Sequence, residues 1–360
     1  MEDGVLTLEQ LGWTERLAEA FRELQRPDWM PARIVRLERG VAHVRTSDGE
    51  VAARVGGRIS HHADDPGERP AVGDWVAVTP ETDAGEALVR ARLPRRTRFL
   101  RQAAGRTSEP QVLAANLDTL LIVCGLDGDF NPRRIERYLA LARAGGVDPV
   151  VVLNKTDLCD DLETKLAEAR AAAPGVPVVA IGAKEGRGLD ALEPWLERGT
   201  TLALVGSSGV GKSTLVNQLL GEDRVRTGEV RASDDRGRHT TTRRELFVLP
   251  GGALWIDTPG LRELQLSADT EDVGSAFPEI EQVAEGCKFR DCEHGNEPGC
   301  AVREASDAGT LDPARIEAWA RLRREAVNEQ RRKDERLARA DSRRLGKLYK
   351  RIQSEKNNRR

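Results

Sequence analysis

One octapeptide, Gly206–Ser213, limits the possible folds of this chain more than any other stretch. Its sequence is Gly-Ser-Ser-Gly-Val-Gly-Lys-Ser, and it lies between the apolar run Leu202–Val205 and a helical stretch at Thr214–Leu220. Glycines let backbone N–H groups surround phosphate oxygens where a helix begins. The sequence therefore predicts an α/β sheet carrying a phosphate-binding loop, and the strand–loop–helix setting argues against a glycine-rich turn that matches by chance.

The side chains of this loop suggest separate roles. Lys212 is expected to reach the β- and γ-phosphates, and the Ser213 hydroxyl is expected to coordinate Mg²⁺. The rest of the predicted phosphate cradle consists of Gly206, Ser207, Ser208, Gly209, Val210, Gly211 and Thr214.

A second predicted element of the site is Asp257-Thr258-Pro259-Gly260, which follows the apolar run Ala253–Ile256. A carboxylate at a strand end downstream of a phosphate loop can orient the magnesium shell, so we assign this role to Asp257. Gly260 would offer its N–H to the γ-phosphate. The runs Leu246–Leu249 and Ala253–Ile256 are expected to form a hairpin that continues the sheet.

The tetrapeptide Asn154-Lys155-Thr156-Asp157, after the apolar run Pro149–Leu153, indicates which base is bound. The Asp157 carboxylate can accept hydrogen bonds from N1–H and from the exocyclic amine of guanine, a pair that adenine does not offer. Lys155 would lie along the base, and Asn154 would tie this turn to the phosphate loop. A polar turn without a ligand is the alternative for the tetrapeptide alone.

A companion turn, Gly182-Ala183-Lys184, follows the next apolar run. It is expected to place the Ala183 N–H on the guanine oxygen and Lys184 beside the base. Together these motifs predict a site for GTP with Mg²⁺.

These motifs occur in an unusual order. Ras-like GTPases have the phosphate loop first and the guanine motif last, whereas here Asn154–Asp157 precedes Gly206–Ser213. A compact domain tolerates this rearrangement because its termini often lie close together. The sequence therefore predicts a circularly permuted GTPase domain, assigned to residues 98–268, whose segment from Asp257 leads directly into the C-terminal region.

The charged stretch that contains Gly237-Arg238-His239-Thr240-Thr241-Thr242 occupies the place of switch I. One threonine should complete the magnesium shell; we favour Thr241, with Thr240 and Thr242 left open. Leu261 stands where Ras-like proteins keep a water-orienting glutamine, so slow intrinsic hydrolysis is expected. His239 is a candidate for the missing group, and a surface histidine is the alternative.

The residues before the GTPase domain change periodicity. Residues 7–26 predict a short amphipathic helix within an N-terminal extension, residues 1–30. Residues 31–97 predict a small β-barrel, with an OB-fold as the candidate, followed by a basic linker over Arg95–Arg106. Trp75 is a candidate for base stacking, with a place in the core as the alternative. The predicted strands are Ala32–Leu37, Val41–Arg45, Val51–Val55, Asp74–Val78 and Ala87–Leu93.

Further along, apolar runs alternate with helical stretches, which favours a parallel sheet covered on both faces. Cys124 ends one of these runs and is expected in the core. The runs are Leu117–Cys124, Pro149–Leu153, Pro177–Ile181 and Thr201–Val205, and the helical stretches include Arg133–Ala144 and Leu162–Ala173.

Three cysteines and a histidine gather near the C-terminus, at Cys287, Cys292, His294 and Cys300. Three thiolates and an imidazole make a closed tetrahedral set, which predicts one structural Zn²⁺ per chain in a helical domain over residues 269–360. Iron and a chance cluster of free thiols are the alternatives. Because no coordination position stays open, this metal is not expected to take part in catalysis.

Charge is spread unevenly along the chain. Residues 331–360 hold 13 Lys and Arg against 4 Asp and Glu, although the formal net charge of the whole chain is −3. This basic tail favours a nucleic-acid partner, with a solvated basic helix as the alternative. We find neither a signal segment nor an apolar run of about 18 residues, so we expect a cytoplasmic monomer with no membrane partner.

As a set, these motifs resemble the bacterial ribosome-small-subunit-dependent GTPase A family. The resemblance runs from about Ala32 to the C-terminal helices and rests on the barrel, Pro94-Arg95-Arg96, the permuted motifs, the Gly237–Thr242 stretch and the Cys/His spacing. Gly182 departs from the family's usual serine. The resemblance implies a factor that binds the 30S subunit and its 16S rRNA, hydrolyses GTP when stimulated by it, and acts late in its assembly.

Two other functions stay open at this point. The chain could be an RNA-binding protein that GTP switches on another structured RNA, with turnover incidental. It could also be a nucleotide-regulated scaffold built on the Cys/His region. Stimulation of GTP turnover by 30S particles would favour the enzyme over the switch. The scaffold predicts no loss of RNA binding when the basic tail is removed, whereas the other two functions predict weaker and less salt-dependent binding.

Overall fold

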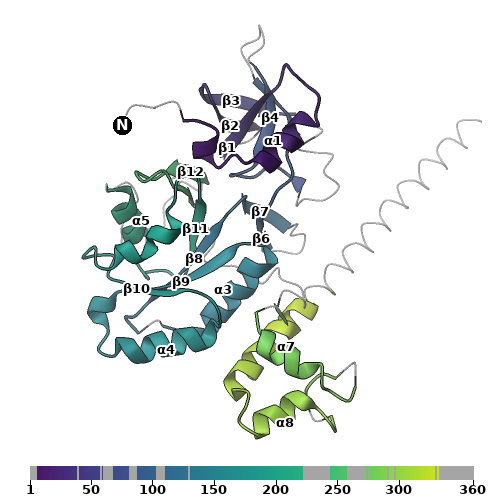
Figure 1. Cartoon of the computed structure of the whole chain (residues 1–360), viewed down its shortest axis with the longest axis vertical. Helices are drawn as coiled ribbons and strands as arrows, with labels where there is room; N and C mark the ends of the chain where they lie inside the picture. The colour runs from purple at the N-terminus through teal and green to yellow at the C-terminus, as the bar shows by residue number, and fades with distance from the viewer. Residues whose placement is uncertain are drawn as a thin grey trace, which may run out of the picture. The chain divides into compact units, whose positions relative to one another are not determined.

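The computed structural model describes residues 6–38, 40–56, 59, 68–80, 87–102, 110–128, 130–221, 244–257, 273–274, 276–289, 292–295, 297–328 and 331. The chain divides into two compact units, Met1–Gln265 and Leu266–Arg360, which we call unit 1 and unit 2 (Figure 1). His239, Thr240, Thr241, Thr242, Gly260 and the basic tail after residue 331 lie outside the described residues.

The main sheet of unit 1 joins two structures of different kind (Figure 1). Its described strands follow the order β10-β9-β8-β11-β13-β12-β1-β2-β3-β5-β4, and β1 also pairs with β4. A single residue pair, Arg36 on β1 with Glu245 on β12, connects the two halves in antiparallel register.

The first half is a closed five-stranded barrel, because β1 pairs with both β2 and β4. Alternate residues point inward as the period of two requires: Ala32 and Ile34 of β1 pack with Val44 of β2 and Val76 of β4. The prediction of a five-stranded, OB-like barrel is confirmed. Its strands are β1 (Met30–Glu38), β2 (Val41–Thr46), β3 (Gly49–Val55), β4 (Trp75–Thr79) and β5 (Ala87–Arg92).

The second half is a mostly parallel sheet in which β8, β9, β10, β11 and β13 run in the same direction. Only β12 is antiparallel, and it forms the expected hairpin with β13. The strands are β8 (Thr119–Gly125), β9 (Asp148–Asn154), β10 (Val178–Ile181), β11 (Thr201–Val205), β12 (Glu245–Val248) and β13 (Leu254–Asp257). The helices are α3 (Pro132–Ala144), α4 (Leu162–Ala172) and α5 (Lys212–Leu220), with a 3-10 helix η4 at Leu189–Trp195.

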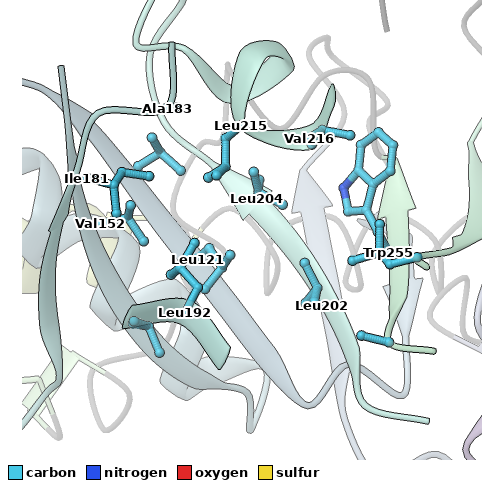
Figure 2. Close-up of a cluster of buried hydrophobic side chains, with 14 of the residues drawn as sticks. Leu121, Val152, Ile181, Ala183, Leu192, Leu202, Leu204, Leu215, Val216 and Trp255 are labelled. Carbon is cyan, nitrogen blue, oxygen red and sulfur yellow. The ribbon is translucent and has the colours of Figure 1, made fainter. Parts of the chain in front are cut away.

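An apolar cluster fixes α5 against this sheet (Figure 2). Leu215 and Val216 of α5 pack on Leu121, Leu204 and Trp255 of three neighbouring strands. Each fully buried side chain of this size contributes about 1.5–3 kcal/mol. The start of α5, where the phosphate loop ends, is therefore anchored by the core and does not depend on a ligand for its position.

A second, two-stranded sheet stands where the sequence favoured a linker. Strand β6 (Arg98–Gln102) pairs with β7 (Pro110–Ala115) in antiparallel register. The expectation of a linker over Arg95–Arg106 is therefore wrong for residues 98–102. The physical reason is the burial of Phe99 and Leu113, which gives this charged stretch an apolar side.

The N-terminal segment packs on the barrel in two short pieces, η1 (Glu9–Leu11) and α1 (Glu15–Arg22), instead of one helix over 7–26. Gly12, at φ +85°, ends the first piece. Leu11, Leu17 and Trp75 belong to one cluster, and the Trp13 and Trp75 rings meet edge to face at 4.7 Å. Trp75 is 1% exposed, so it is a core residue and does not stack on bases.

Unit 2 is helical around a small core. Helix α7 (Pro278–Ala284) and helix α8 (Ala301–Asp307) precede a helical stretch over residues 313–328. Trp319 of that stretch is buried and donates from Nε1 to Glu281 Oε1 of α7 at 2.9 Å. Across the described residues of both units, no helix combines the length and the apolar character needed to cross a membrane.

Candidate nucleotide site and metal centre

The sequence-predicted nucleotide residues gather at one edge of the parallel sheet. Asn154 is the last residue of β9, Gly182 follows β10, Gly206 follows β11 and Asp257 ends β13. Because these strands are parallel, their carboxyl ends lie at the same edge, where α/β folds place their ligands. The neighbours of β11 are β8 and β13, so the phosphate loop leaves the sheet between them.

Close backbone approach makes glycine necessary at two positions of the loop. A Cβ on Gly206 would lie 2.2 Å from the Val123 carbonyl oxygen, and a Cβ on Gly211 would lie 2.3 Å from Asn154 Nδ2. Gly206 has φ +146° and Gly211 has φ +94°, values that side-chain-bearing residues rarely adopt. The loop therefore has the shape that a phosphate cradle needs.

The Lys212 ammonium lies back over this loop. Its Nζ donates to the carbonyl oxygens of Gly206 at 2.8 Å and Ser207 at 2.6 Å. Ser213 follows in the first turn of α5, where free N–H groups and the helix dipole favour an anion. The arrangement offers positive charge to a phosphate, with a hydroxyl beside it.

Arg134 is a neighbour of the loop that the sequence analysis missed. It lies on α3, and its Nη1 donates to the Ser207 hydroxyl. The signal was available in principle, because α3 follows β8 and β8 is the parallel neighbour of β11. Its charge adds to that of Lys212 on the side of the loop that faces α3.

Asn154 joins the guanine turn to the phosphate loop, as the sequence analysis expected. Its Nδ2 donates to the Val210 carbonyl at 2.8 Å, and its Oδ1 accepts from the Ala183 N–H at 3.0 Å. The residue is 2% exposed. One buried amide therefore holds three loops in fixed relation, although the loops follow three different strands.

One expected guanine donor, the Ala183 N–H, has a hydrogen-bond partner within the protein. The Ala183 N–H was assigned to the guanine oxygen, but in this structure it donates to Asn154 Oδ1. On the same turn, the N–H of Lys184 makes no hydrogen bond to any described residue.

Asp157 and Lys155 are presented differently. Asp157 lies in the exposed 3-10 helix η3 (Thr156–Leu158) and makes no ion pair or hydrogen bond within the part of the chain described, so its oxygens are free to accept. Lys155 has φ +68°, and its ammonium pairs with Asp127 in the loop after β8. Asp127 was not among the predicted site residues, although the pairing of β8 with β9 brings the ends of these strands together.

In unit 2, Cys287, Cys292, His294 and Cys300 converge as predicted. Their ligand atoms all lie within 4.8 Å of one another. His294 Nδ1 is 3.5 Å from Cys287 Sγ and 3.6 Å from Cys300 Sγ. This cluster can hold a metal ion, with Nδ1 as the imidazole donor.

The surroundings keep the imidazole oriented. The His294 ring lies 5.1 Å from the buried Trp319 ring, and α8 begins directly after Cys300. Burial, assisted by the charge of Arg323, lowers the pKa of His294, so the neutral form that binds metals is favoured. The backbone of His294 also has a positive φ, +59°, and this turn of the chain brings the ring back toward Cys287.

Comparison with known proteins agrees with this geometry. The family model described as RsgA GTPase matches residues 92–267. The small ribosomal subunit biogenesis GTPase RsgA of Opitutus terrae is 50% identical over 353 residues, which is 96% of each chain. A protein of the same name from Xylella fastidiosa (strain M23) is 55% identical over 263 residues, 73% of this chain and 77% of its own.

Solved structures give the same fold. The structure of YjeQ from Thermotoga maritima is 25% identical with a TM-score of 0.62, and the match covers 83% of this chain and 99% of that one. YloQ, described as a circularly permuted GTPase, matches 84% of this chain and 96% of its own with a TM-score of 0.58 at 23% identity. The permuted order and the family resemblance are thus confirmed. The chain belongs to the RsgA GTPase family.

Proposed function

We propose that this protein is a GTP hydrolase that binds the small ribosomal subunit and acts in its biogenesis. The observation that carries the nucleotide part is the Asn154 amide, which holds the phosphate loop and the guanine turn together across strands that are far apart in sequence. The ribosomal part rests on relatives of that name that match nearly the whole chain.

The roles of the residues follow from their positions. Asp157 selects guanine because its free carboxylate accepts from both ring N1–H and the exocyclic amine, a pair of bonds that ATP cannot make. Lys212 neutralises the phosphates, and Ser213, Asp257 and Thr241 would hold Mg²⁺. That ion lowers the repulsion between phosphate oxygens during in-line attack by water.

The groups nearest the attacking water come from residues outside the described ones. We assign the γ-phosphate N–H to Gly260 and keep His239 as the candidate that orients water. Thr241 is our first choice for the Mg²⁺ ligand from this stretch, and Thr240 and Thr242 remain the alternatives. The missing glutamine at Leu261 gives a reason for the subunit to stimulate turnover, because the partner must complete the catalytic arrangement.

For the metal centre we propose one structural Zn²⁺. A tetrahedral ion with Zn–S of about 2.3 Å and Zn–N of about 2.0 Å places sulfur and nitrogen about 3.5 Å apart. The two sulfur–nitrogen distances to His294 are 3.5 and 3.6 Å. These two distances therefore fit the ion, and four protein donors leave no position for a substrate.

We further propose that the partner surface is 16S rRNA in the 30S particle, and that the protein acts in the cytoplasm as a monomer. The barrel is an OB-like fold of the kind that binds nucleic acid, and the basic tail adds charge for phosphates. The domain boundaries at residues 30, 97 and 268 are part of the same proposal.

Steady-state GTP hydrolysis tests this function. The purified protein is assayed alone and with 30S, 50S or 70S particles, with ATP as the control substrate and Lys212→Ala as the control variant. Strong stimulation by 30S with no turnover of ATP is expected. GTP turnover that no particle changes would leave the GTPase intact and favour the alternative, a GTP-switched protein that binds another structured RNA.

A further inference from the structure

A cavity of about 270 Å³ lies in unit 1 between the N-terminal segment, the barrel and the loop before β11. Four arginines line it: Arg16 from α1, Arg33 from β1, Arg96 after the barrel, and Arg198 before β11. Among the described lining residues the carboxylates are Glu9 and Asp118, so these residues together carry a formal excess of two positive charges. None of these residues belongs to the nucleotide site.

Arg33 is the most unusual of the four, because its charge is buried without an acidic partner in contact. The guanidinium donates to the carbonyl oxygens of Leu11, Gly73 and Asn116, and the residue is 1% exposed. Burial lowers the pKa of Arg33 to about 10. Carbonyl groups satisfy N–H donors but do not cancel a charge, so a buried guanidinium of this kind favours a nearby anion.

The two carboxylates that act on the Arg33 charge, Asp118 and Asp74, each form an ion pair with another arginine. Asp74 forms a buried two-point ion pair with Arg95, at 2.6 and 2.7 Å. Asp118 pairs with Arg96 and accepts the Thr201 N–H at 2.6 Å. The positive charge of Arg33 is therefore offset only at longer range.

Arg16 and Arg198 stand at the cavity with their charges available. Both are exposed, and neither makes an ion pair with any residue that the structure describes. The stem of Arg198 is held against Gly252, since a Cβ there would lie 2.9 Å from Arg198 Cγ. Two unpaired guanidinium groups, one of them packed in place, thus face a cavity that already has positive charge.

We propose that this cavity binds a phosphate group. Guanidinium groups match phosphate oxygens in charge and in two-point geometry, and several of them together suit the multiple charge of a phosphate. Pockets for whole small molecules begin at about 300 Å³, so a single phosphate with few attached atoms suits this volume. The phosphate comes either from the backbone of a bound RNA or from a free phosphate compound.

The position of the cavity separates it from the GTP site. Thr201, whose N–H bonds Asp118, is the first residue of β11, whereas the phosphate loop leaves the other end of that strand. The wall is closely packed: a Cβ on Gly12 would lie 2.8 Å from the Gly199 carbonyl oxygen. A ligand in the cavity would therefore contact residues at the start of β11, the end of the strand opposite to the phosphate loop.

The test uses the full-length protein saturated with a non-hydrolysable GTP analogue and Mg²⁺, so that all three phosphate positions of the GTP site are filled and added phosphate cannot enter it. Inorganic phosphate is titrated while the indole N–H signal of Trp13, a lining residue, is followed by NMR and assigned with Trp13→Phe. Acetate at equal ionic strength is the control anion. The variant is Arg16→Gln with Arg198→Gln, and the matched control is Arg170→Gln, an exposed arginine on α4.

We expect phosphate to shift the Trp13 signal, and the double variant to weaken this binding at least tenfold while Arg170→Gln leaves it unchanged. Both variants should keep the wild-type GDP affinity and thermal midpoint, because the altered side chains carry no ion pair. A Trp13 signal that phosphate does not move overturns the proposal. So does equal phosphate affinity in the double variant, or an equal loss in Arg170→Gln.

A second measurement identifies the source of the phosphate, and this part rests on the proposed function. Binding to 30S particles is measured against salt. If the phosphate belongs to RNA, the double variant binds 30S particles more weakly. The slope of log affinity against log salt concentration should then fall by the amount expected for about one lost phosphate contact. If only inorganic phosphate binding is lost, the ligand is a free phosphate compound. Failure of the ribosomal assignment is distinguishable, because it abolishes 30S stimulation of wild-type GTP turnover.

Discussion

The nucleotide site of unit 1 and the Cys/His cluster of unit 2 keep their geometry by different means. Buried parallel strands carry the nucleotide loops, and one amide, Asn154, ties them together. The Cys/His ligands lie on loops within fourteen residues, with the Trp319 ring as apolar support. The nucleotide site is formed before its ligand arrives. The Cys/His cluster instead brings three thiols together, and a metal ion must stabilise that arrangement.

The largest effect should come from Cys300→Ser. Removal of one thiolate from a closed set is expected to reduce bound metal from about one ion per chain to near zero. Because structural zinc contributes about 10–16 kcal/mol of apparent binding free energy, unit 2 should then lose its fold. Metal analysis by mass spectrometry and limited proteolysis measure both, and GTP affinity should stay within a few-fold.

Cys159→Ser is the matched control, since this half-buried cysteine lies in unit 1 and should leave the metal content unchanged. If Cys300→Ser lost GTP binding together with the metal, the proposed difference between the two sites would be wrong, because the nucleotide site would also depend on the ion.

Asp157→Asn tests guanine selection. An amide cannot accept two hydrogen bonds from guanine as a carboxylate does, so GTP affinity should fall about 100-fold or more, as for other lost charged bonds in recognition sites. Fluorescent GTP displacement measures it. Asp160→Asn, at an exposed neighbour, should leave the GTP affinity unchanged. An equal loss of affinity in that variant would mean that the net charge of the region matters, and not the position of Asp157.

Asn154→Ala sharpens the idea of a preformed site. The change leaves the Val210 carbonyl and the Ala183 N–H without partners, at about 1–3 kcal/mol for each buried group. We expect GTP to bind roughly 10- to 100-fold more weakly and the thermal midpoint to fall by several degrees.

Its control is Asn131→Ala, which removes the side-chain cap that accepts the Arg133 N–H at 3.0 Å. This variant should lose about 1 kcal/mol of stability with unchanged GTP affinity. Equal affinities in Asn154→Ala and the wild-type protein would show that the loops are positioned by the strands alone.

The smallest effect is expected from Asp127→Asn. The Lys155–Asp127 pair is partly exposed, with side chains 24% and 31% accessible, so it contributes about 0–1 kcal/mol. GTP affinity should change by less than about fivefold. A larger change would make Asp127 an essential support of the base-binding lysine.

Most of the fold was predictable from the sequence because buried strands and loop motifs have local signatures. The five barrel strands, the parallel sheet and the β12–β13 hairpin all depend on short-range periodicity. The β6–β7 hairpin was missed because charged residues such as Arg98 and Arg101 interrupt the apolar pattern of its sequence. The two-piece N-terminal segment was missed because Gly12 was not recognised as a helix end.

The site could be predicted in its residues but not in its connections. Asp127 and Arg134 were missed because their neighbours in space, Lys155 and Ser207, are distant along the chain. The hydrogen bond from the Ala183 N–H to Asn154 Oδ1 was missed for a similar reason, because a motif does not show which N–H a buried amide accepts from. The Cys/His set was easier, because its spacing alone brings the donors within reach.

The permuted strand order also affects how the protein can fold while it is being synthesised. Strands β8, β9 and β10 are consecutive in the chain and adjacent in the sheet, so they can pair as soon as they emerge. Strand β11, the inner neighbour of β8, is made about 75 residues later than β8. Until then the open edge of β8, whose residues are all buried in the finished protein, has no native partner. Slow elongation over this interval therefore prolongs the exposure of an aggregation-prone edge.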